Sequence, residues 1–197
     1  MTGEAGRMRV IGGISRGKRL FVPKGNLARP TSDRIREALF NILRDVRGFA
    51  FLDLYAGSGA VGIEALSRGA ARSVFVEQDL RMAESLKRNI RECGFDRASE
   101  VLETDARTGI RRLSRRGERF DLVFADPPYA ANRVGDILKE TAEWPLLVPE
   151  GLLVIQHSVR EEQVGTAAGG WNCSDTRRYG DTVLSFYEMT ARGENYA

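Results

Sequence analysis

The chain has 197 residues, 42% apolar and 29% charged, and its formal net charge is only +3. This length predicts one domain with at most a small appendage. No apolar run approaches the roughly 18 residues that a membrane-spanning helix needs, and the basic, polar start is unlike a secretory signal, so we expect a cytoplasmic protein. With two cysteines and a single histidine, His157, a zinc site is not expected.

The charge is unevenly distributed along the chain. Residues 1–47 contain 11 Lys and Arg against 4 Asp and Glu, whereas residues 48–197 contain 19 against 23. A basic arm on a mildly acidic body favours an anionic partner, with nucleic acid the first candidate. A solvated basic tail would explain the same distribution equally well.

A short basic hairpin is expected near the start of the chain. Residues 9–11 and 19–22 have an extended pattern, and glycines lie between them. The turn region carries Arg16, Lys18 and Arg19, which could contact a phosphate backbone. A linker over residues 23–30 follows, and then a helix over residues 31–43 whose outward face is expected to carry Arg34 and Arg36.

Strand and helix patterns alternate from residue 49 onward. The expected strands are 49–54, 73–77, 98–103, 120–125, 151–157, 171–178 and 182–189. The expected helices between them are 62–68, 80–93, 108–115, 137–143 and 161–168. The alternation predicts an α/β fold with a mostly parallel seven-stranded sheet and helices on both faces. The turn at 179–181 predicts a final hairpin, and hence an antiparallel last strand.

The first of these strands breaks into a glycine-rich loop. Gly57, Gly59 and Gly62 spell GxGxxG, and Glu77 follows at a distance that fits a dinucleotide site. The residues that follow the predicted strands include several acids but no Lys or Arg. Such a pocket suits a cation with sugar hydroxyls and an amine better than it suits a pyrophosphate.

The fourth strand runs into the tetrapeptide Asp126-Pro-Pro-Tyr129. The prolines fix the backbone and lack donors, so nearby carbonyl groups remain available as acceptors beside the Asp126 carboxylate. Tyr129 adds an aromatic ring for stacking. This set suits a planar ligand with an exocyclic NH₂ group. Alone the tetrapeptide is more typical of a rigid turn, but its place three strands after the glycine loop makes the combination much more specific.

The combination resembles the Rossmann-like class I methyltransferases that use S-adenosylmethionine to methylate exocyclic or amide nitrogens. With the stretches 9–20 and 29–43 included, residues 8–189 are similar to the RsmD family. This resemblance implies transfer of a methyl group to N2 of a guanine in ribosomal RNA of an assembling or assembled small subunit. It also implies S-adenosylhomocysteine as the product and no metal.

The resemblance also assigns roles to individual residues. The proposed cofactor-binding residues are Asp53, Tyr55, Gly57, Gly59, Glu77, which would accept from the ribose hydroxyls, and Asp105, which would accept from the adenine amino group. The proposed catalytic residues are Asp126 and the Pro127 carbonyl as acceptors for the target NH₂, and Tyr129 as the stacking ring. The proposed RNA-binding residues are Arg16, Lys18, Arg19, Arg34 and Arg36.

The expected organisation is a basic tail and hairpin over residues 1–28 and a methyltransferase domain over residues 29–197. A monomer is expected, because no long exposed apolar face stands out. A second basic cluster, between residues 107 and 116, could contact RNA, although a solvated helix face explains it at least as well.

Three alternatives remain open at this stage. A dinucleotide oxidoreductase fits the glycines but not Asp126-Pro-Pro-Tyr129. Methylation of another NH₂ group, adenine N6 or a protein glutamine, fits that tetrapeptide equally well, and only the N-terminal resemblance favours guanine. A non-catalytic RNA-binding factor on the same fold would not need the tetrapeptide.

Overall fold

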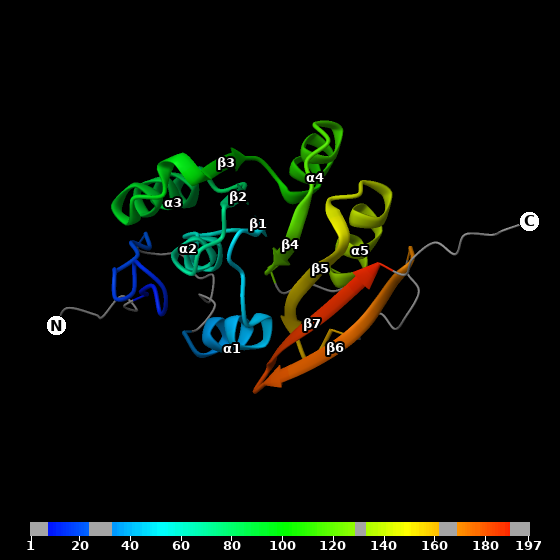
Figure 1. Ribbon diagram of the computed structural model, residues 1–197. Coiled ribbons are helices and arrows are strands. Elements are labelled where there is room, and N and C mark those ends of the chain that lie inside the picture. Colours follow the sequence, from blue (N-terminus) through cyan, green and yellow to red (C-terminus); the bar gives the residue numbers. More distant parts are fainter. Residues whose placement is uncertain (1–7, 24–32, 129–132, 162–168, 190–197) are drawn as a thin grey trace, which may run out of the picture.

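A computed structural model describes residues 8–23, 33–128, 133–161 and 169–189 (Figure 1). Seven strands form one sheet in the order β3-β2-β1-β4-β5-β7-β6. They are β1 Ala50–Leu54, β2 Arg72–Glu77, β3 Ser99–Glu103, β4 Phe120–Ala125, β5 Leu147–Ser158, β6 Trp171–Tyr179 and β7 Thr182–Met189. The first five strands pair in parallel, and β7 pairs antiparallel with both β5 and β6. The predicted Rossmann-like sheet with an antiparallel last strand is therefore confirmed.

The helices of the described residues follow the predicted alternation. They are α1 Asp33–Leu43, α2 Ala60–Ser67, α3 Leu80–Cys93, α4 Ala106–Arg115 and α5 Arg133–Glu143, with a 3₁₀ turn at Asp96–Ala98. The helix α3 ends at Gly94, which adopts the left-handed conformation that ends many helices. The helix expected at 161–168 falls almost wholly outside the described residues. No helix in the described ranges is long and apolar enough to span a membrane.

Two buried clusters lie on opposite faces of the sheet. Successive strand residues such as Phe51 and Leu52 alternate between the two clusters, as the pleat of a strand requires. Residues of α1, α2 and α3 pack on one face, and residues of α4 and α5 pack on the other. Among the five parallel strands, β1 lies in the middle and separates β2 and β3 from β4 and β5. This reversal of strand order places a ligand crevice at the carboxyl end of β1.

The N-terminal hairpin is short and packs into the first cluster. One antiparallel bridge joins Arg9 to Arg19, and the flanking backbone hydrogen bonds join residues 8, 10, 17, 18 and 20. Met8, Val10 and Leu20 are buried with residues of α2 and α3. The predicted hairpin is confirmed, although only one bridge joins its two sides. A hairpin with so little pairing of its own depends on its packing against the helices for stability.

Candidate active site

The glycine loop turns sharply at the end of β1. Three of its residues have positive φ angles: Tyr55 at 62°, Gly57 at 56° and Gly59 at 82°. Such a φ is uncommon for a tyrosine and costs on the order of 1 kcal/mol, so the surrounding contacts must hold Tyr55 in place. A Cβ on Gly59 would lie 2.2 Å from Leu86 Cδ1. Gly59 is therefore required both by its backbone angles and by the close approach of α3.

Asp53 lies buried beneath this loop, with only 2% of its surface exposed. Its Oδ2 accepts a hydrogen bond of 2.9 Å from the backbone N–H of Gly62 in α2. Burial is the main cause that raises the pKa of Asp53 to about 8; the Gly62 hydrogen bond lowers it, and the charges of Asp126 and Glu77 add to the rise. Two further predicted site acids, Glu77 at the end of β2 and Asp126 after β4, therefore lie close enough to Asp53 to act on its carboxyl group.

Glu77 ends β2 and links that strand to the glycine loop. Its two carboxylate oxygens accept hydrogen bonds of 2.7 Å from the backbone N–H groups of Gly57 and Asp79. These bonds fix the carboxylate at the rim of the crevice, and each oxygen keeps a lone pair that can accept from a ligand. This geometry fits recognition of two neighbouring hydroxyl groups.

Asp105 follows β3, and Tyr55 is the first residue of the glycine loop. Asp105 caps α4 by accepting a 3.0 Å hydrogen bond from Thr108 N–H, and this bond holds its pKa below the usual range. Partial burial raises the pKa of Tyr55, and the charge of Asp105 contributes to that shift. Asp105 was expected only at a strand end. Its additional role as a helix cap explains why α4 begins two residues earlier than predicted.

The predicted catalytic tetrapeptide follows β4 at the same edge. Asp126 is half-buried, and its backbone N–H donates to Leu54 O over 3.5 Å. Pro127 is buried and Pro128 is exposed. Tyr129 lies outside the described residues, so its predicted stacking role stays a prediction.

These residues fit S-adenosylmethionine in their donor and acceptor chemistry. Carboxylates stand at the ends of β2, β3 and β4, and the backbone of Gly57 is open. Only Met82 Cε, at 3.7 Å, lies near the place that a Cβ on Gly57 would occupy. The described residues contain no group of three or more His, Cys, Asp or Glu placed to hold a metal ion.

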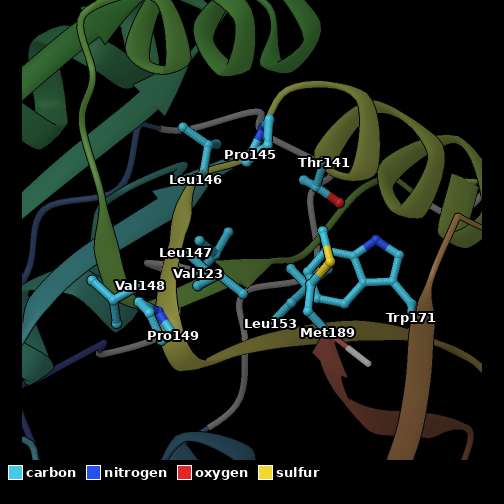
Figure 2. A pocket seen from close by; sticks show the side chains of 10 residues that line it. All are labelled: Val123, Thr141, Pro145, Leu146, Leu147, Val148, Pro149, Leu153, Trp171 and Met189. Carbon is cyan, nitrogen blue, oxygen red and sulfur yellow. The ribbon is translucent and has the colours of Figure 1, made fainter. Parts of the chain in front are cut away.

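An apolar cavity of about 240 Å³ lies elsewhere, between α5, the beginning of β5 and the start of β6 (Figure 2). Trp171 and Met189 line one side, and residues 145–149 line another. The cavity lies at the end of the sheet where β5 begins, away from the glycine loop. Its polar hydroxyl, on Thr141, already donates to Ile137 O within α5. The cavity offers no carboxylate for an amine or a ribose, so it is not part of the predicted cofactor site.

The predicted RNA-binding residues divide into two groups. Arg16, Lys18 and Arg19 are exposed on the hairpin, and Arg34 is exposed on α1. The prediction for Arg36 is wrong: its side chain is fully buried, where it donates to Arg9 O at 2.6 Å and to Asp33 at 2.8 Å. The helical pattern placed Arg36 away from the core because the sequence did not show that the predicted hairpin would pack against that side of α1.

The basic cluster at 107–116 is paired in part with nearby acids. Arg107 and Arg111 form ion pairs with Glu140 of α5, and Arg116 pairs with Glu100. The guanidinium groups of Arg111 and Arg115 also lie 5.7 Å and 5.1 Å from the centre of the Trp144 ring. These contacts join α4 to its neighbours and account for much of the cluster.

Three buried polar residues were not predicted from the sequence. Glu64 of α2 is fully buried and accepts hydrogen bonds of 2.7 Å from the N–H groups of Ile11 and Gly12. Ser67 of the same helix bonds Ser15 N–H and Gly12 O. Asn89 of α3 contacts both the hairpin and the glycine loop. The signal that could have found them is the position of each polar residue among the apolar residues on the buried side of its helix.

Comparison with known proteins identifies the family. The model of a family described as conserved hypothetical protein 95 matches residues 8–188. Ribosomal RNA small subunit methyltransferase D of Escherichia coli K12 is 34% identical over 194 residues, covering 98% of this chain and 96% of the relative. The chain belongs to this family, the RsmD family. The family predicted from the motifs is therefore confirmed.

A further relative and two solved structures support the same family and fold. The relative of the same name from Haemophilus influenzae is 35% identical over 154 residues, which is 77% of this chain and 79% of that protein. The solved candidate methyltransferase yhhF of Escherichia coli has a TM-score of 0.81 at 30% identity, covering 95% of this chain and all of that one. A Salinibacter ruber RNA methyltransferase in complex with S-adenosylhomocysteine, 18% identical with a TM-score of 0.63, shares the fold over 83% of this chain and 95% of its own.

Proposed function

We propose that this protein transfers a methyl group from S-adenosylmethionine to the exocyclic N2 of a guanine in small-subunit ribosomal RNA. The observation that carries the proposal is the meeting of Asp53, Glu77 and Asp126 at one edge of the sheet, in a chain of the RsmD family. Its relatives are named for methylation of ribosomal RNA of the small subunit. We propose that the enzyme acts in the cytoplasm and that it is a monomer.

Each site residue has a task that follows from its position. Glu77, held by Gly57 and Asp79, accepts from the ribose hydroxyls, and Asp105 accepts from the adenine amino group. The turn from Tyr55 to Gly59 brings the backbone close to the cofactor. When bound, the cofactor supplies an electrophilic methyl group on a sulfonium. A cationic cofactor near the Asp53 carboxyl would lower its pKa and favour the ionised form. Asp53 would then provide negative potential beneath the loop.

The target amine requires activation because its lone pair is delocalised into the guanine ring. The Asp126 carboxylate and the Pro127 carbonyl accept from the two N–H groups of the amine, which favours the pyramidal, nucleophilic form. The same acceptors stabilise positive charge as it develops on the nitrogen. Tyr129 would stack on a base removed from its helix or loop, a contact worth about 1–3 kcal/mol. Arg16, Lys18, Arg19 and Arg34 contact RNA phosphates.

The test is transfer of labelled methyl groups to RNA. Small-subunit particles and free ribosomal RNA from an Escherichia coli strain lacking its own family member are incubated with the protein and labelled S-adenosylmethionine, and the product nucleosides are separated. We expect N2-methylguanosine. Asp126→Ala should abolish the label, whereas Asp126→Asn, which keeps an acceptor oxygen, should retain part of it. Both variants should still bind S-adenosylhomocysteine.

Other products would change the assignment. Label in N6-methyladenosine or in a protein glutamine would overturn the guanine assignment while preserving the chemistry of Asp126. Cofactor binding without label in any RNA or protein would indicate a non-catalytic factor. Full activity of Asp126→Ala would remove the proposed catalytic role of that residue.

A further inference from the structure

Asn89 lies on the buried face of α3, between the hairpin and the glycine loop. Its side chain is fully buried. Its Nδ2 donates to the carbonyl oxygens of Phe21, at 3.0 Å, and Ser58, at 2.9 Å. Its Oδ1 accepts from the backbone N–H of Phe21 at 2.8 Å. One amide group therefore bonds both backbone groups of Phe21 and the carbonyl group of the loop residue Ser58.

This arrangement fixes two segments relative to each other. The Asn89 amide pairs with Phe21 as a neighbouring strand would, using one donor and one acceptor, while its second donor reaches the loop. Ser58 is buried, so its carbonyl oxygen would be left without this partner, at a cost in stability, if the Asn89 amide were removed. Asn89 therefore holds the backbone of Phe21 and the backbone of Ser58 close to each other.

A second contact joins the same two segments. The Ser58 hydroxyl lies 3.1 Å from Met8 Sδ, on the other side of the hairpin. Ser58 itself lies between Gly57, whose N–H donates to Glu77, and Gly59, which packs against Leu86 of α3. The loop proposed to touch the cofactor is thus attached to both ends of the hairpin proposed to touch RNA.

We propose that Asn89 is a positioning residue that couples the cofactor site to the RNA-binding hairpin, so that each ligand raises the affinity for the other. The inference rests on the proposed function. A cofactor that immobilises the loop from Tyr55 to Gly59 also orders the segment at Phe21, and RNA then binds a hairpin that has less freedom left to lose. Thermodynamic linkage requires the reverse effect to be equal. Such coupling is typically about 5- to 150-fold.

The test compares dissociation constants in a thermodynamic cycle. S-adenosylhomocysteine, which binds without turnover, is titrated into the full-length protein with and without saturating small-subunit ribosomal RNA. We expect at least about fivefold tighter binding in the presence of RNA for the wild-type chain. Asn89→Ala should bring the ratio close to one. Glu84→Ala, a change at an exposed position of the same helix, should leave the ratio at the wild-type value.

A purely structural role for Asn89 predicts a different result. In that case Asn89→Ala would lower the melting temperature, but the ratio of the two dissociation constants would stay at the wild-type value. A second measurement does not depend on a folded variant: hydrogen exchange at the Phe21 amide, which donates to Asn89. We expect S-adenosylhomocysteine to slow this exchange in the wild-type protein. Unchanged exchange, or a wild-type ratio of one, would overturn the proposal.

The outcomes separate this inference from the proposed function. Methyl transfer to N2 of guanine with a coupling ratio of one overturns the coupling alone. Absence of transfer to any RNA overturns the proposed function, and the coupling to RNA falls with it.

Discussion

Asp53 shows how a single buried acid can make stability depend on pH. Burial raises its pKa from 3.8 to about 8. Between these two values the folded protein holds a proton that the unfolded chain has already released. The contribution of Asp53 to the free energy of unfolding is therefore greatest below pH 4 and is lost as the pH rises towards 8.

Asp53→Asn should remove this dependence in the cofactor-free protein. From pH 5 to pH 8 the free energy of unfolding of the wild-type chain should fall by up to about 4 kcal/mol more than that of the variant, because one pKa unit corresponds to about 1.4 kcal/mol. Asparagine can still accept from Gly62 N–H, so the loop bond is kept. Urea unfolding at several pH values measures the difference. Parallel pH profiles for the two proteins would show that folding does not raise the pKa of Asp53.

Gly59 and Gly94 offer a matched pair of left-handed glycines. Their φ values are 82° and 80°, but a Cβ on Gly59 would meet Leu86 Cδ1 at 2.2 Å, whereas a Cβ on Gly94 would meet nothing within 4 Å. Gly94→Ala should cost only the backbone strain, about 1–2 kcal/mol. Gly59→Ala should cost about 1–3 kcal/mol more through overpacking. Thermal unfolding of both variants checks this, and equal melting temperatures would contradict the close approach of α3.

At the scale of elements, the hairpin and α2 form one unit through Glu64. This buried carboxylate accepts from the N–H groups of Ile11 and Gly12 and from Arg68 Nε, each at 2.7 Å. Glu64→Gln places an NH₂ group against donors and should lower the free energy of unfolding by about 2–4 kcal/mol. Trypsin should then cleave faster at Arg16, Lys18 and Arg19.

A matched control for Glu64→Gln is Glu92→Gln on α3. Glu92 is exposed and pairs with Arg88, so its replacement should change stability by less than about 1 kcal/mol. Similar trypsin cleavage rates for the two variants would contradict the role of Glu64 in holding the hairpin.

Element positions were largely predictable, because strand and helix periodicities are local properties of the chain. The predicted fourth and seventh strands agree with β4 and β7 at both ends. The fifth was predicted to begin at Gly151, but β5 begins at Leu147. The run Pro149-Glu150-Gly151 has the composition of a turn, and Glu150 has a φ of 65°. Pairing with β4, through a register shift between Phe120 and Leu122, carries the strand through that irregular segment.

The placement of the acids was predictable for a geometric reason at the scale of the whole molecule. Carboxyl ends of parallel strands meet at one edge, so acids after successive strands could be placed together from the sequence alone. Asp53, Glu77 and Asp126 meet that expectation. Arg36 and Asn89 did not reveal their environments, because both are buried by contacts with a hairpin distant in sequence. A place on the apolar face of a helix can indicate that such a residue is buried, but it does not show which distant segment supplies its partners.

The uneven charge distribution leads to a prediction about RNA binding by the whole protein. Each phosphate that the protein no longer neutralises should reduce the dependence of log K on log salt by about 0.7–0.9. Replacing Arg16, Lys18 and Arg19 with alanine should therefore reduce the slope by about 2–3. The matched control replaces Arg107, Arg111 and Arg116, which pair with Glu140 and Glu100, and removes the same charge. Binding to small-subunit ribosomal RNA is measured between about 50 and 200 mM salt, a range over which phosphate contacts weaken strongly. Equal changes in slope would indicate a general effect of net charge, and an unchanged slope for the hairpin variant would exclude the hairpin as the RNA contact.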